Sequence, residues 1–208
     1  MLKSYLEKTY GYNEPIFLNQ LSIDGLSENA VRQAVKRLVS SGFLVRFDTG
    51  IYYIPRTDGI LGKSYLDPAV VISRRYIAGG GNTYGYITGL SFAVELGLTT
   101  QMSAVTEIVS NCESSNGRMI TIGNQRIRIR KPAVRISSDN VSLLQFLDAV
   151  GQAEKYTELT AGETMEILSS YIRKCGFTRV QLAAVSSALT EAVAKKLIQW
   201  ELIYEFVG

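Results

Sequence analysis

The sequence contains no histidine, and this absence excludes several kinds of enzyme site. Serine–histidine–aspartate and cysteine–histidine catalysis both need an imidazole as the general base, and histidine is a common zinc ligand. An enzyme built from this chain would have to use carboxylates, lysine, tyrosine or cysteine. The sequence therefore favours binding over catalysis, and we expect no catalytic residues, no metal site and no cofactor.

Cysteine and long apolar runs are also scarce. Cys112 and Cys175 are the only cysteines and form no CxxC pair, so we expect reduced core residues rather than a disulfide or a zinc site. No apolar run reaches the ~18 residues that a transmembrane helix needs. The N-terminus lacks the basic start and continuous apolar stretch of a signal peptide. We therefore expect a soluble cytoplasmic protein that does not enter a membrane.

Charge is distributed unevenly along the 208 residues. Residues 1–59 hold seven Lys/Arg and six Asp/Glu, residues 60–136 hold nine and four, and residues 137–208 hold six and nine. The three net charges of +1, +5 and −3 give the total of +3. A basic middle and an acidic tail suggest two surfaces with different partners, although a mixed surface can show this pattern by chance.

The N-terminal module, residues 1–57, has the element order of a winged helix-turn-helix. Apolar spacing predicts a helix over 2–10, and a very short strand and a brief second helix follow within 16–21. A longer amphipathic helix, capped by Ser27, then extends to Val39. A hairpin over 43–54, with a three-residue loop, completes the order and supplies the wing.

The outer arc of the longer helix is suited to reading DNA. Asparagine and glutamine can pair with adenine edges, and arginine and lysine with guanine edges or phosphates. We expect duplex DNA to contact Ser27, Glu28, Asn29, Arg32, Gln33, Lys36 and Arg37 on the helix, and Arg46, Thr49 and Tyr52 on the wing. The alternative is an amphipathic helix with a solvated polar face beside an unrelated hairpin.

Two segments carry a more specific pattern. The first contains Leu38, Gly42, Leu44-Val45-Arg46 and Gly50-Ile51-Tyr52, and the second runs from Ile87 to Gln101. Over residues 15–130 the chain resembles the AbiEi-type antitoxins of type IV toxin–antitoxin systems. The resemblance implies an autorepressor that binds the operator in its own promoter and neutralises a nucleotidyltransferase-like toxin. The alternative is a stand-alone winged-helix regulator whose C-terminal domain dimerises or senses a ligand.

A second domain is expected over 64–208, after a linker at 56–66 that contains Gly59 and Gly62. The expected elements are helices over 67–78 and 86–96, a strand over 104–110 and a hairpin over 119–130. They suggest a small antiparallel sheet with helices on one face. The predicted fold class is therefore α+β: a winged helix-turn-helix, a mixed domain with this sheet, and a helical C-terminal part.

Alternation in the last predicted strand places Ile127 and Ile129 on one face and Arg126, Arg128 and Arg130 on the other. Lys131 and Arg135 extend the basic cluster. The arginine face is either a secondary basic surface, which tracks phosphates or meets an acidic partner, or a solvated sheet face. As a basic surface it would add to the DNA affinity of the N-terminal module.

Residues 138–200 are predicted to be helical, and the apolar-rich end of the chain, residues 202–207, fits either a strand or a continued helix. A first helix ends at Gly151, capping boxes begin at Thr160 and Thr178, the second leading to Leu189, and Thr190 caps a last helix. Five carboxylates invite a nuclease hypothesis but are dispersed over helix faces and loops: Asp148, Glu154, Glu158, Glu163 and Glu166. Because a metal nuclease needs converging carboxylates, we favour a partner-binding surface or a solvated exterior.

Overall fold

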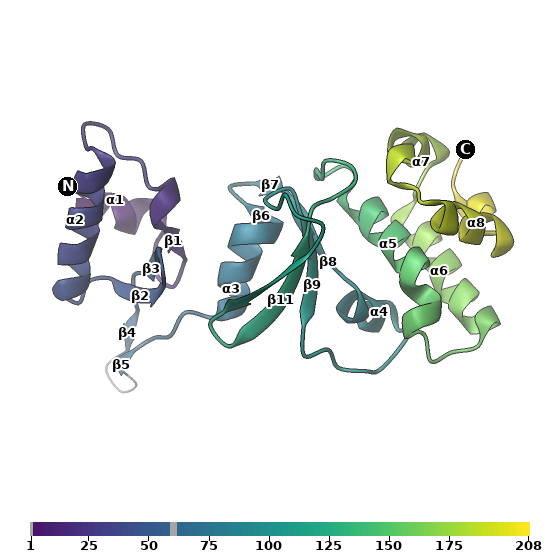
Figure 1. Cartoon of the computed structure of the whole chain (residues 1–208), viewed down its shortest axis with the longest axis horizontal. Coiled ribbons are helices and arrows are strands. Elements are labelled where there is room, and N and C mark those ends of the chain that lie inside the picture. Colours follow the sequence, from purple (N-terminus) through teal and green to yellow (C-terminus); the bar gives the residue numbers. More distant parts are fainter. Residues whose placement is uncertain (1, 59–61) are drawn as a thin grey trace. The chain divides into compact units, whose positions relative to one another are not determined.

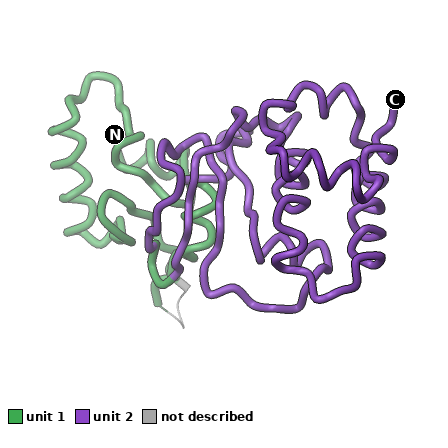
Figure 2. Tube along the Cα trace, turned by 45° about the vertical axis from the view of Figure 1, so that its right-hand side comes forward, with its two compact units in different colours: residues 1–74, 122–124 green, residues 75–121, 125–208 purple. Residues whose placement is uncertain are grey.

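The computed structural model describes residues 2–58 and 62–208 and has an α+β fold. The chain divides into two compact units (Figure 2): unit 1 comprises residues 1–74 and 122–124, and unit 2 comprises residues 75–121 and 125–208. Within the described ranges, no helix has the length and apolarity needed to cross a membrane.

Unit 1 begins with the elements expected from the sequence (Figure 1). They are α1 (Leu2–Thr9), β1 (Ile16–Phe17), the 3-10 helix η1 (Leu18–Gln20), α2 (Glu28–Ser40), β2 (Val45–Asp48) and β3 (Ile51–Tyr53). The brief second helix expected near Leu21 is thus a single 3-10 turn. The strands form an antiparallel sheet in the order β1-β3-β2, with a register shift between Arg46 and Asp48.

Helix α2 follows directly from its sequence. The Ser27 hydroxyl accepts a hydrogen bond from the Ala30 amide at 3.3 Å, which satisfies one of the free N–H groups of the first turn. Val31 and Val35 are 3% and 2% exposed and pack into the core of unit 1. Full burial of each side chain contributes about 1.5–3 kcal/mol, so the apolar stripe fixes which face of α2 remains in water.

The segment expected as a linker at 56–66 contains short structure. Strands β4 (Thr57–Asp58) and β5 (Gly62–Lys63) pair in antiparallel fashion. Residues 59–61, and with them Gly59 of the expected linker, lie outside the described residues. The division between the units falls after residue 74, so unit 1 also includes α3 (Pro68–Ile72).

The helix expected over 67–78 changes type within its length. Asp67 caps α3, its carboxylate accepting from the Ala69 amide at 2.8 Å. The chain continues as a π-helix, η2 (Ser73–Ile77), and then forms a two-stranded hairpin of β6 (Ala78–Gly79) and β7 (Asn82–Thr83). Gly80 and Gly81 form the tip of this hairpin, both with positive φ.

Unit 2 contains a four-stranded sheet in the order β10-β11-β9-β8. The strands are β8 (Gly85–Thr88), β9 (Thr106–Ser110), β10 (Arg118–Ile122) and β11 (Gln125–Arg130). The two-residue turn between β10 and β11 lies where Gly123-Asn124 predicted it. β8 and β9 are antiparallel, but β9 and β11 are parallel. The sheet is thus mixed rather than wholly antiparallel. Residues 111–117 connect β9 to β10, and β11, the second strand of the following hairpin, pairs with β9 in the same direction.

The helix predicted over 86–96 is wrong in its first part. Residues 85–88 form β8, and only Leu90–Leu96 form a helix, α4. Gly89 separates the two with φ +67°, a conformation that breaks a helix and that side chains other than glycine resist. Tyr86, Ile87 and Thr88 are residue types that favour strands, so the local sequence carried a signal that the helical periodicity obscured.

The C-terminal part is helical, as predicted (Figure 1). The helices are α5 (Val141–Tyr156), α6 (Ala161–Cys175), α7 (Arg179–Ala184), the 3-10 turn η3 (Ser186–Ala188), α8 (Glu191–Gln199) and the 3-10 turn η4 (Leu202–Glu205). Both capping boxes and the Thr190 cap form, although the helix after Thr178 stops at Ala184 rather than Leu189.

Helix α5 does not end at Gly151 as predicted. A Cβ at Gly151 would lie 3.1 Å from Cγ2 of Val193, so the glycine serves close packing of α5 against α8. In the core of unit 2, the rings of Phe146 and Tyr171 stack with centroids 5.7 Å apart.

The prediction that both cysteines belong to the core is wrong. Cys112 and Cys175 are free thiols and both are exposed. Cys112 lies in the turn after β9, and Cys175 is the last residue of α6, where the chain leaves the packed helix face.

Candidate functional site

The outward face of α2 gathers the polar side chains expected to contact DNA. All of them are exposed, opposite the buried valines: Ser27, Glu28, Asn29, Arg32, Gln33, Lys36 and Arg37. Glu28 and Arg32 form an ion pair at 3.6 Å, with their side chains 90% and 63% exposed. Such a pair is worth at most about 1 kcal/mol, so Arg32 can exchange it for a phosphate or a base at little cost.

The hairpin holds Arg46 against its own loop. The guanidinium donates to the Thr49 hydroxyl at 3.2 Å and to the Asp48 carbonyl at 3.3 Å. Tyr52, the cross-strand partner of Arg46, is half-buried and packs against the core of unit 1. Arg46 and Thr49 are therefore exposed at the tip of the hairpin, whereas Tyr52 anchors the hairpin to the core of unit 1.

Strand β11 has the predicted alternation but not a uniform basic face. Ile127 and Ile129 are 0% exposed, while Arg126 and Arg128 are exposed. Arg130 departs from the expected exposed stripe because its Nη2 donates to the Asp148 carboxylate on α5 at 2.5 Å. Beyond the strand, Lys131 and Arg135 are exposed.

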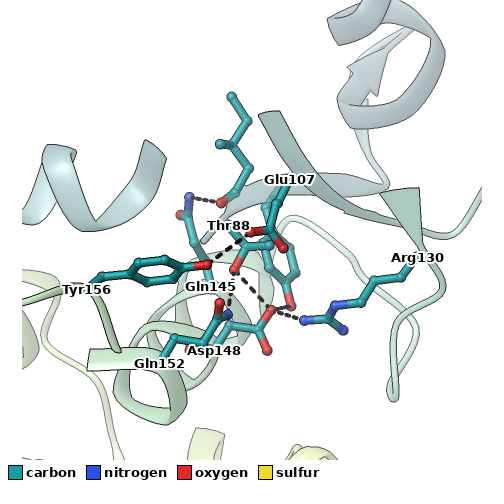
Figure 3. Close-up of polar contacts among 9 residues, drawn as sticks. Thr88, Glu107, Arg130, Gln145, Asp148, Gln152 and Tyr156 are labelled. Carbon is teal, nitrogen blue, oxygen red and sulfur yellow. Dashed lines mark hydrogen bonds and ion pairs between the residues drawn. The ribbon is translucent and has the colours of Figure 1, made fainter. Parts of the chain in front are cut away.

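Asp148 is the centre of a polar cluster between the sheet and α5 (Figure 3). Its Oδ2 accepts hydrogen bonds from Arg130, from the Tyr86 hydroxyl at 3.0 Å and from the Thr88 hydroxyl at 3.3 Å. Burial raises the pKa of Asp148 above its ordinary value, although the charge of Arg130 opposes this. Burial and the nearby Asp148 also raise the pKa of Tyr86, which keeps the phenol protonated as a donor.

A second set of contacts joins β9 and the C-terminal end of α5. The Tyr156 hydroxyl donates to Glu107 at 3.0 Å and accepts from the Lys155 ammonium at 2.9 Å. The hydrogen bond to Tyr156 raises the pKa of Lys155. Gln152 donates to the Thr88 hydroxyl at 3.5 Å, a long contact that adds Gln152 to the Asp148 cluster (Figure 3).

Beside these side chains lies a cavity of about 240 Å³. It is lined by Thr88, Glu107, Ile108, Asn116, Arg128, Arg130, Gln152 and Lys155. This site was not predicted from the sequence, because Tyr86 and Thr88 were expected in a helix and lie on β8. Their period-2 spacing on a strand, matched by the alternating arginines of β11, was the available signal.

The carboxylates of the nuclease hypothesis are spread over separate contacts. Glu154 pairs with Lys196 at 3.0 Å, Glu166 with Arg173 at 2.8 Å, and Glu163 completes the α6 capping box. Glu158 accepts from the Thr100 amide at 3.0 Å. In the described part of the chain, no three Asp, Glu or Cys side chains are grouped so that they could hold a metal ion.

One family model matches this chain, over residues 12–173, and its description is "Family of unknown function (DUF6088)". The match covers most of unit 1 and of unit 2 up to α6. None of the curated proteins compared with the chain matches it. The chain belongs to the DUF6088 family.

Proposed function

We propose that this member of the DUF6088 family is a cytoplasmic DNA-binding regulator that represses transcription through an N-terminal winged helix-turn-helix. In this proposal α2 is the recognition helix and the β2–β3 hairpin is the wing. The observation that carries it is the exposed face of α2, where Asn29, Arg32, Gln33, Lys36 and Arg37 all point to solvent while the opposite stripe is buried.

The dimensions and chemistry of α2 support this role. Its 13 residues extend over about 20 Å at 1.5 Å per residue, and a helix of ordinary diameter fits the major groove. Asn29 and Gln33 offer paired donors and acceptors to adenine, and the three cations can reach guanine edges or phosphates. Arg46 and Thr49 at the hairpin tip would contact the backbone and set the orientation of α2.

The resemblance to AbiEi-type antitoxins supports a finer proposal. The operator would lie in the protein's own promoter, and the protein would counteract a nucleotidyltransferase-like toxin. If such a reading frame is the neighbouring gene, expression of that gene should arrest growth, and co-expression of this chain should restore it. Continued arrest would leave the DNA-binding proposal intact and remove the antitoxin proposal.

A stand-alone regulator whose second unit senses a ligand is the other candidate. The cavity beside Arg128 and Lys155 favours it, because an antitoxin that acts only through DNA or a toxin surface has no need of a lined cavity.

DNA binding can be tested by fluorescence anisotropy with a duplex from the chain's own promoter. Arg32→Ala and Lys36→Ala should each weaken binding by about 1–3 kcal/mol, or roughly 5- to 150-fold. Lys195→Ala is the matched control, because it removes an exposed cation from a helix of unit 2. Equal affinities for all four proteins, or a loss in Lys195→Ala as large as in Arg32→Ala, would contradict the proposal.

A further inference from the structure

The cavity of unit 2 is lined mainly by groups that donate hydrogen bonds. Arg128 and Arg130 on β11 and Lys155 on α5 bring three positive charges to it. The amides of Asn116 and Gln152 add uncharged donors. Such a set is what an oxyanion requires: several converging donors, of which some are cationic.

The acidic groups nearby are already engaged. Asp148 accepts from Arg130 and thereby balances one of the three cations. Glu107 accepts the hydroxyl proton of Tyr156, which in turn accepts from Lys155. The three cations Arg128, Arg130 and Lys155 outnumber the two carboxylates of Asp148 and Glu107, so the net charge of this set is +1 and the cavity retains a positive charge.

Arg128 is the side chain that the internal contacts leave unused. It is exposed, and within residues 2–58 and 62–208 it forms no hydrogen bond and no ion pair. The hydrogen bond to Tyr156 raises the pKa of Lys155, and the nearby charge of Arg128 acts in the opposite direction. Two cations held near each other on one cavity wall are stabilised when an anion binds between them.

The cavity volume limits what can bind. Pockets for drug-sized ligands are about 300–1,000 Å³, and this one is about 240 Å³. A phosphate with a small organic body fits this volume, whereas a nucleic-acid duplex cannot enter it. Guanidinium and ammonium groups are the common protein ligands of phosphate oxygens.

From these contacts we propose that the cavity between the unit 2 sheet and α5 binds a small phosphate compound, either inorganic phosphate or a phosphomonoester. Arg128 and Lys155 hold the phosphate oxygens, and the amides of Gln152 and Asn116 orient them. Arg130 serves the site indirectly, because its contact with Asp148 holds in place a side chain that lines the cavity (Figure 3). The site stands independently of DNA binding by α2.

Calorimetric titration of the full chain tests the proposal, with inorganic phosphate and glycerol 3-phosphate as probes and chloride at matched ionic strength as the reference. Both probes should bind with one site per chain. Arg128→Met and Lys155→Met should each weaken binding at least tenfold. Arg126→Met is the matched control, because Arg126 is exposed on the same strand and does not line the cavity. It should bind as the wild type does.

Each outcome of this titration decides the proposal. Tighter binding of glycerol 3-phosphate identifies a phosphomonoester as the ligand, and equal binding identifies phosphate itself. No saturable heat with either probe overturns the site, as does an equal loss in Arg126→Met and Arg128→Met. Far-ultraviolet circular dichroism of each variant separates lost binding from lost folding.

Discussion

The polar face of α2 and the arginine face of β11 look alike in sequence and differ in structure. Both are cation-rich and lie opposite buried aliphatic residues. On α2 these side chains remain in water, with one exposed ion pair between Glu28 and Arg32. On β11 one arginine contacts Asp148 of α5, and two line a cavity.

The difference lies in what covers each face. Among the described residues of unit 1, the polar side chains on the outer arc of α2 are exposed, so they remain available to a partner. Within unit 2, α5 packs against the sheet, and its Asp148 accepts a hydrogen bond from Arg130 of β11. Polar groups of the first kind contribute little to stability, and those of the second kind contribute more because their loss leaves buried partners unsatisfied.

The largest expected effect is on the folding of unit 2. Asp148→Ala removes the acceptor shared by Arg130, Tyr86 and Thr88. Because the Tyr86 and Thr88 hydroxyls then lose the acceptor of their protons, the free energy of unfolding should fall by about 2–3 kcal/mol. Arg32→Ala on α2 should change it by no more than about 0.5 kcal/mol. Urea unfolding followed by circular dichroism measures both, and similar values for the two variants would remove the distinction between the faces.

A smaller effect is expected at the turn that leads from β8 into α4. Gly89→Ala forces a side chain into φ +67° and places its Cβ 2.6 Å from the Glu107 carboxylate, and this contact should cost about 1–3 kcal/mol. Gly162→Ala in the first turn of α6 meets no atom within 4 Å and should be neutral or stabilising, by up to about 1 kcal/mol. Thermal unfolding measures the midpoint temperature of both variants. A Gly89→Ala midpoint equal to that of the wild type would contradict the described turn.

The smallest effect concerns pH. Hydrogen bonds from the Thr100 amide, Gln101 and Thr99 lower the pKa of Glu158 from 4.5 to about 2. Because the folded pKa is the lower one, Glu158 stabilises the fold above pH 4.5, and this contribution is lost as the pH falls toward 2. The difference in urea midpoint between the wild type and Glu158→Gln should therefore be greatest above pH 5 and narrow on acidification. A difference independent of pH would show that the carboxylate charge is not involved.

The sequence predicted best those elements whose signals are local. Ser27, Thr160, Thr178 and Thr190 each cap a helix through a bond that spans three residues, and Gly123-Asn124 forms its hairpin turn. Caps and tight turns depend on residues a few positions apart, so a single sequence contains their full description.

Features that depend on distant residues could not be predicted in this way. The parallel pairing of β11 with β9 and the passage of α5 through Gly151 are set by tertiary packing. The contact between Arg130 and Asp148 joins residues 18 apart, and the alternation of β11 gave no sign that Arg130 contacts a helix. The α2 face was accessible to prediction because it needs no tertiary partner.

The most direct test of the account compares promoter DNA binding by two double variants in one anisotropy experiment. Arg32→Ala/Lys36→Ala changes the exposed face of α2, and Arg128→Met/Lys155→Met changes the cavity of unit 2 while removing the same charge. The account predicts at least a tenfold loss of affinity for the first and an unchanged affinity for the second. An unchanged affinity for the first, with a large loss for the second, would contradict it.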